Sequence, residues 1–138
     1  MGAVMSNQIS TSRLYVMRIL YLLNFVMLGV DVWPTILNPA GAWDPVKGAA
    51  YSLWASLSLL SVLGLRYPIQ MLPLLLFQFV YKVIWLAAIA LPQWAGLKSM
   101  DITQAMLIGV VLDLIVIPWP FVIAKYLVQH GDRWRSKA

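Results

Sequence analysis

Four long apolar runs dominate the chain, and short polar segments separate them. A helix needs ~20 mainly apolar residues to cross about 30 Å of hydrocarbon, and each run is near that length. We therefore predict an all-α integral membrane protein, an antiparallel bundle of four transmembrane helices in a single domain over 1–138. The predicted helices span residues 14–33, 48–65, 68–91 and 102–127.

The segments between the runs indicate how the helices are joined. Residues 34–47 form the only long predicted loop, and they include three prolines and a glycine as helix breakers. Almost no residues separate the second run from the third, so these two helices are predicted to form a tight hairpin. The third predicted loop covers residues 92–101.

The composition supports membrane insertion and excludes several kinds of site. Of the 138 residues, 62% are hydrophobic and only 11% are charged, whereas soluble domains usually carry about 25% charged residues. The absence of cysteine excludes disulfides, thiolate metal sites and thiol redox chemistry. With a single histidine, we expect no metal site and no cofactor within the chain.

The charges are distributed asymmetrically, which predicts orientation and not nucleic-acid binding. Basic residues gather on the side of the termini and the second loop: Arg13, Arg18, Arg66, Lys125, Arg133, Arg135 and Lys137. The opposite side has Lys47 and Lys98, with Asp31, Asp44 and Asp101. By the positive-inside rule we predict a multi-pass protein of the bacterial inner (plasma) membrane with both termini, and the basic tail 128–138, in the cytoplasm.

Two charged residues, Lys82 and Asp113, lie near the middle of consecutive apolar runs. If Leu91 and Ala105 mark the same membrane face, both lie roughly 12–14 Å deep. Because an ionisable residue at that depth is costly and usually paired, we predict a Lys82–Asp113 pair. The pair either handles protons or ions, or serves as a static link that fixes helix register.

Further polar and small residues are predicted to surround this pair. Gln78, Lys82 and Trp85 share one face of the third helix, together with Ile89, and a cation–π contact between Lys82 and Trp85 is possible in that arrangement. In the fourth helix, Gly109 permits a close approach of a neighbouring helix. Two prolines at 118 and 120 predict a kink and leave backbone carbonyls that offer a cation or a proton-carrying water a place to bind.

The first helix adds Asn24 and Asp31, which are seven residues apart and therefore share a face. One interpretation makes Asp31 the mouth of a polar path that leads past Asn24 to Lys82. The alternative makes Asn24 an interhelical hydrogen-bonding residue and Asp31 a cap on an exposed helix end.

The second helix carries four serines, of which Ser56 is near Lys82 in predicted depth. Ser52 and Ser56 are predicted to let helices pack closely, as small residues do in membranes. A serine beside a lysine also resembles a Ser–Lys catalytic arrangement, but no complete catalytic set is visible, which argues against an enzyme.

Four aromatic residues near the pair, Tyr51, Trp54, Tyr81 and Trp85, are predicted either to line a pocket or to face lipid. As a pocket they fit a flat hydrophobic ligand such as a quinone, a sterol-like lipid or an aromatic drug. As lipid-facing residues they have no ligand.

The stretch 66–76, RYPIQMLPLLL, followed by Tyr81, Lys82 and Trp85, resembles a pattern in small uncharacterised bacterial four-helix membrane proteins. The preceding stretch 51–58, YSLWASLS, is similar to the same pattern. At the level of topology the chain also resembles DoxX-like four-helix proteins. These resemblances imply a four-helix membrane fold and no particular activity.

Two functions from different classes fit these observations. The first is an oligomeric transporter or channel component in which Lys82 and Asp113 handle protons or ions. The second is a membrane module that binds a lipid, a quinone or a partner protein, with the pair in a structural role. A polar path from Asp31 to Lys82 and on to the cytoplasm favours the first, whereas a pair closed off by packed leucines favours the second.

Overall fold

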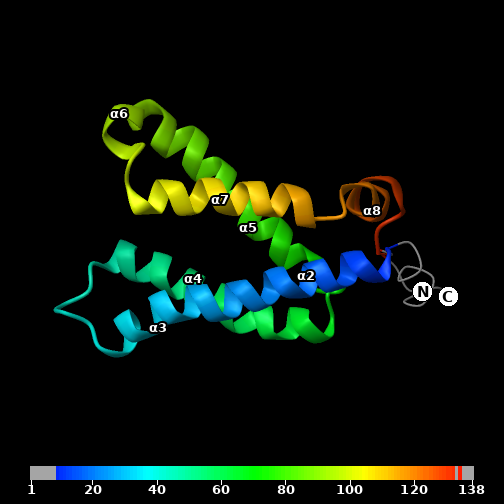
Figure 1. Cartoon of the computed structure of the whole chain (residues 1–138), viewed down its shortest axis with the longest axis horizontal. Helices are drawn as coiled ribbons and strands as arrows, with labels where there is room; N and C mark the ends of the chain where they lie inside the picture. The colour runs from blue at the N-terminus through cyan, green and yellow to red at the C-terminus, as the bar shows by residue number, and fades with distance from the viewer. Residues whose placement is uncertain (1–8, 133, 135–138) are drawn as a thin grey trace.

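The computed structural model describes residues 9–132 and residue 134, and in this part of the chain every regular element is helical (Figure 1). Three helical spans are long and apolar enough to cross a membrane: Thr11–Leu37, Pro45–Arg66 and Leu72–Leu97. A bent pair, Asp101–Val116 and Trp119–Val128, meets the same test only if its two parts are taken together. The prediction of an all-helical fold is therefore confirmed for the described residues.

The first span consists of α2 (Thr11–Leu23), the π-helical turn η1 (Asn24–Leu28) and α3 (Gly29–Leu37). Ser10 caps its start, since the serine side chain accepts a hydrogen bond from the Arg13 backbone N–H at 3.1 Å. The prediction that Pro34 starts a loop is wrong, because Pro34 lies within the last turn of α3. Its fixed φ fits a helix, and it removes only one backbone hydrogen bond there.

The second span is α4 (Pro45–Arg66), which begins three residues before the predicted start. Asp44 caps it by accepting a hydrogen bond from the Lys47 backbone N–H at 2.9 Å. Pro45 occupies the first helical turn, where no N–H partner is required, so this proline starts a helix and does not extend the loop.

The third span consists of α5 (Leu72–Ile84), η2 (Trp85–Ala90), the short 3₁₀ turn η3 (Leu91–Gln93) and α6 (Trp94–Leu97). Residues 67–71 form the turn before it, so the predicted start at residue 68 is four residues too early. The span also runs past Pro92, which lies in the first turn of η3, and the predicted loop 92–101 shrinks to residues 98–100.

The fourth run is not a single helix. The helix α7 (Asp101–Val116) ends at Ile117, and α8 (Trp119–Ile123) continues with η4 (Ala124–Val128) at an angle of 78° to α7. Pro118 and Pro120 cause the break, since proline cannot donate to the preceding turn and pushes the residue before it out of the helical region. The predicted kink is thus a full break.

The helices form a bundle with two unlike ends (Figure 1). At the α8 end lie the start of α2, the α4–α5 turn and α8. At the opposite, α6 end, Figure 1 shows the α3–α4 pair diverging from α6 and α7. Five residues of the basic tail 128–138, namely 133 and 135–138, fall outside the described residues.

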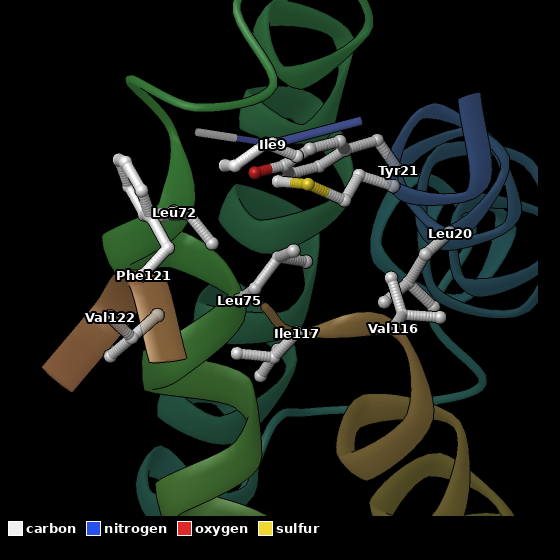
Figure 2. Close-up of a cluster of buried hydrophobic side chains, with 10 residues drawn as sticks. Ile9, Leu20, Tyr21, Leu72, Leu75, Val116, Ile117, Phe121 and Val122 are labelled. Carbon is white, nitrogen blue, oxygen red and sulfur yellow. The ribbon is translucent and has the colours of Figure 1, made fainter. Parts of the chain in front are cut away.

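A core of apolar side chains fills the α8 end (Figure 2). It joins α2, α5, α7 and α8 and contains Ile9, Met17, Leu20, Tyr21, Leu72, Leu75, Val116, Ile117, Phe121 and Val122. We call these ten residues the core cluster. Most outward-facing positions elsewhere are also apolar, for example Val30 at 70% and Ile108 at 61% exposure. Helices that are apolar all round are typical of membrane spans.

Candidate functional site

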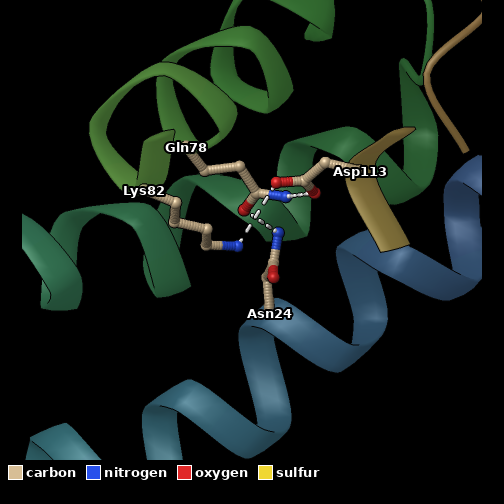
Figure 3. A network of polar contacts seen from close by, with 4 residues as sticks. All are labelled: Asn24, Gln78, Lys82 and Asp113. Carbon is tan, nitrogen blue, oxygen red and sulfur yellow. Dashed lines mark hydrogen bonds and ion pairs between the residues drawn. The ribbon is translucent and has the colours of Figure 1, made fainter. Parts of the chain in front are cut away.

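Four polar side chains from three spans meet in the middle of the bundle (Figure 3). The Asn24 side-chain amide donates to Gln78 Oε1 at 2.7 Å, and Gln78 Nε2 donates to Asp113 Oδ1 at 2.5 Å. Lys82 Nζ lies 3.4 Å from the other carboxylate oxygen of Asp113. We call Asn24, Gln78, Lys82 and Asp113 the polar cluster; it brings together residues that the sequence analysis placed in three separate helices.

The two charged residues of the polar cluster are buried to different extents. Asp113 and Gln78 are fully buried, whereas the Lys82 side chain keeps 12% of its surface exposed. Asp113 accepts one hydrogen bond at each oxygen, so its charge is compensated. Lys82 has three N–H groups, and among the described residues Asp113 is its only hydrogen-bond acceptor, at the long distance of 3.4 Å.

Gly109 makes room for the side chain of Lys82, which belongs to the neighbouring helix α5. A Cβ atom built on Gly109 would lie 2.6 Å from Lys82 Nζ and 2.9 Å from Lys82 Cε. The lysine stem therefore lies directly across the backbone of α7. Any larger residue at this position would push the ammonium away from Asp113.

A cavity of about 800 Å³ extends from the polar cluster towards the α6 end. Its inner end, which we call the floor, contains Asn24, Gln78 and Lys82, and its mouth carries the charged residues Asp31, Lys47 and Asp101. The walls between floor and mouth are mainly apolar and aromatic, and they include Leu23, Met27, Tyr51, Trp54, Tyr81, Met106, Ile108 and Leu112. We call this space the main cavity; it has the volume and lining typical of small-molecule sites.

The main cavity does not continue to the α8 end. Beyond Gln78 and Asp113, the core cluster occupies the interior, and its residues Leu72, Leu75 and Ile117 have at most 1% of their surface exposed. The polar side chains therefore lead from Asp31 past Asn24 to Lys82 and stop there.

The carbonyls that the break in α7 frees have side-chain partners. The Arg13 guanidinium donates to the carbonyls of Ile115 and Val116, the second at 3.2 Å. The Trp119 indole N–H donates to the Leu114 carbonyl at 3.0 Å. A guanidinium and an indole already bind these carbonyls, which disfavours the predicted cation or water site there.

Trp85 does not share a site face with Lys82. It lines a second, smaller cavity of about 290 Å³ together with Ile89, Phe77 and Ile84. The three residues from Lys82 to Trp85 turn the α-helix by about 300°, so the Trp85 side chain points about 60° away from that of Lys82. No cation–π contact between Lys82 and Trp85 is found among the described residues.

Ser56 also lies outside the site. It is exposed and donates a hydrogen bond to the Ser52 carbonyl on its own helix at 2.9 Å. Trp54 lines the main cavity. Ser56 follows Trp54 by two residues on the same helix, so its side chain points ~200° away from that of Trp54. The helix contact uses Ser58 instead, which is fully buried and donates to the Phe25 carbonyl in η1 at 2.9 Å.

One important contact at the α8 end has no counterpart in the sequence analysis. The Tyr21 ring packs directly on Gly64, and its hydroxyl donates to the Pro68 carbonyl at 2.9 Å. Arg18 Nε donates to the Leu65 carbonyl at 2.9 Å. These contacts fix α2 against the end of α4. A glycine within an apolar helix indicates a close contact, but the sequence does not indicate that Tyr21 makes it.

The described residues contain no group of three or more histidine, cysteine, aspartate or glutamate side chains placed to hold a metal ion. The groups present at the site are hydrogen-bonding side chains, a charge pair and an apolar cavity wall. No model of a known protein family matches the chain, and no match is found among curated proteins or among solved structures.

Proposed function

We propose that this chain is an integral membrane protein that binds a small, largely apolar molecule in the main cavity. The observation that carries the proposal is the cavity of about 800 Å³ that ends on the polar cluster. An apolar space with a few convergent polar groups is the usual form of a small-molecule site.

Membrane insertion rests on the apolar spans and on their apolar outer faces. In the described chain, four basic residues, Arg13, Arg18, Arg66 and Lys125, belong to the α8 end, and two, Lys47 and Lys98, belong to the α6 end. By the positive-inside rule we place the α8 end in the cytoplasm of a bacterial cell and the mouth of the main cavity on the outer side of the inner membrane. In this orientation α8 and η4, at 78° to α7, lie along the cytoplasmic interface.

Binding is favoured over a continuous ion path because the core cluster closes the cytoplasmic half. An ion in the main cavity would meet fully buried Leu72 and Leu75 beyond the polar cluster. The cost of placing an ion among such side chains is high. A channel that is open in this conformation is therefore disfavoured.

Transport is the second candidate, and one observation favours it. The main cavity does not reach the α8 end, and that end contains the broken span at Ile117 and Pro118. A break of this kind is a place where a helix end can change its direction. Movement of α8 away from the core cluster would open the cavity to the other side, in a single chain or in a homo-oligomer.

Photolabelling in lipid nanodiscs tests the binding proposal. The probe is an apolar aryl diazirine, and mass spectrometry locates the labelled residues. We expect labels on the cavity wall at Tyr51, Trp54 and Met106, in addition to labels on the lipid-facing surface.

A pair of matched variants separates the cavity from the outer surface. Ala105 lines the main cavity, so Ala105→Phe fills part of it and should reduce the wall labels. Ala88 is exposed and lines neither cavity, so Ala88→Phe should leave them unchanged. Wall residues that stay unlabelled while lipid-facing residues are labelled would overturn the proposal. Proton and cation flux in proteoliposomes, with and without the Lys82–Asp113 pair, tests the transport alternative.

A further inference from the structure

We infer that the ligand of the main cavity is an uncharged amphiphile that enters from the lipid phase and presents a hydrogen-bond acceptor, such as a ketone or ester carbonyl, to Lys82. The inference rests on the proposed function and adds the chemical class of the ligand and its route. Three features support the inference: the charge balance of the floor, the hydrogen-bonding groups at the floor that have no partner among the described residues, and the position of the cavity opening.

The charge balance of the floor disfavours a charged head group. Lys82 and Asp113 compensate each other at 3.4 Å, and Gln78 holds the second oxygen of Asp113. An anionic head would compete with Asp113 for the same ammonium and leave an excess negative charge beside a fully buried carboxylate. A cationic head would lie against the ammonium of Lys82. A neutral head avoids both and costs far less to remove from water.

The hydrogen-bonding groups that remain at the floor are mainly donors. Lys82 lines the cavity and has two N–H groups without an acceptor among the described residues. The Asn24 amide has one N–H beyond the one given to Gln78, and one free oxygen. A carbonyl oxygen on the ligand would satisfy these donors, whereas an aliphatic end would leave them unpaired in an apolar space.

The opening of the main cavity faces the side of the bundle as well as its α6 end. Leu23 and Met27 on the first span, and Ile108 and Leu112 on α7, line the cavity and are also exposed, with Met27 at 66% and Ile108 at 61%. These four residues form an apolar rim between the two helices. In a membrane this rim meets acyl chains, so a lipid-soluble molecule reaches the floor without crossing water.

The walls fit a body with flat or flexible apolar groups. Tyr51 and Trp54 contact each other edge to face, with ring centroids 5.4 Å apart, and Met106 lies on the opposite helix. Aromatic rings and a methionine adapt to such bodies through dispersion and sulfur–aromatic contacts.

Competition photolabelling in nanodiscs tests the head-group assignment. The probe is an alkyl diazirine that carries a methyl ketone, and the readout is the label on Leu28, Tyr51 and Leu57, which line the main cavity and not the smaller one. The competitors share a nonyl chain and differ in the head: undecan-2-one, decanoate and nonyltrimethylammonium. We expect the ketone to compete at a concentration at least about tenfold lower than either charged molecule.

The double variant Lys82→Met with Asp113→Leu removes the head-group site and keeps the cavity. It should retain labelling by the apolar aryl diazirine, which shows that the cavity is intact, and it should lose the preference for the ketone. Equal or better competition by decanoate or by the ammonium compound in the wild type would overturn the inference, as would a ketone preference that survives in the double variant. Failure of every probe to label the wall would instead overturn the proposed function.

Discussion

Replacing Asp113 by leucine tests whether the polar cluster holds the bundle together. The carboxylate accepts from Gln78 at 2.5 Å and from Lys82 at 3.4 Å, and it is fully buried. Asp113→Leu leaves the lysine ammonium without a partner and the glutamine amide with one hydrogen bond fewer. Leucine is larger than aspartate, and the double variant carries the same leucine, so it controls for the change in packing.

The expected loss follows from the burial of the two partners. Breaking a buried pair by removing one member costs about 3–5 kcal/mol. Lys82 is 12% exposed and can turn its ammonium into the main cavity, so we expect the lower part of that range, about 3 kcal/mol. Lys82→Met should cost a similar amount, because it leaves a carboxylate buried with Gln78 alone. The double variant leaves no unpaired charge and should lose only about 1 kcal/mol.

Equilibrium unfolding of the four proteins in mixed dodecylmaltoside and SDS micelles measures these differences. The two single variants should unfold at lower SDS fractions than both the wild type and the double variant. A loss below about 1 kcal/mol for Asp113→Leu would refute the reasoning, and so would a double variant whose loss equals the sum of the two single losses.

Three further changes address neighbouring features, measured by the same unfolding experiment. Gly109→Leu should cost about 2–3 kcal/mol because its side chain displaces Lys82, and Lys82→Ala in the same chain should restore part of the loss; no loss would mean that the lysine does not need this space. Arg13→Met should cost about 2 kcal/mol and speed amide exchange at the end of α7, since its guanidinium holds two carbonyls there. The control Arg66→Met, which removes an exposed arginine beside a tyrosine ring, should change stability by less than about 0.5 kcal/mol. Asn24→Leu should cost about 1 kcal/mol through its hydrogen bond to the cluster; a loss as large as that of Arg13→Met would contradict this.

Hydropathy alone predicts the helical spans well, because each helix is apolar over nearly its whole length. The starts and ends are less predictable where proline is involved. Pro34 and Pro45 look alike in the sequence, yet one lies inside a helix and the other begins one. The outcome depends on which backbone N–H groups need partners at that point, and this is a property of the folded chain.

The polar cluster was partly predictable for a physical reason. Charges at the middle of apolar runs are rare and need partners, so the sequence alone predicts that Lys82 pairs with Asp113. Trp85 was misplaced because the three helical residues after Lys82 turn its side chain about 60° away, and this difference is enough to place it in the smaller cavity. The contact of Tyr21 with Gly64 depends on how two helices cross, which the sequence of either helix does not specify.

The hydrogen bonds of Arg13 have a consequence for the order in which the protein is made. Its acceptors on α7 lie 102 and 103 residues later in the chain, so the arginine leaves the ribosome long before the carbonyls that it binds. Until α7 arrives, the guanidinium must stay in water or among lipid head groups. Closure of the α8 end is therefore a late step of biogenesis, and a nascent chain stopped after α6 should leave Arg13 open to an arginine-specific reagent that the complete protein excludes.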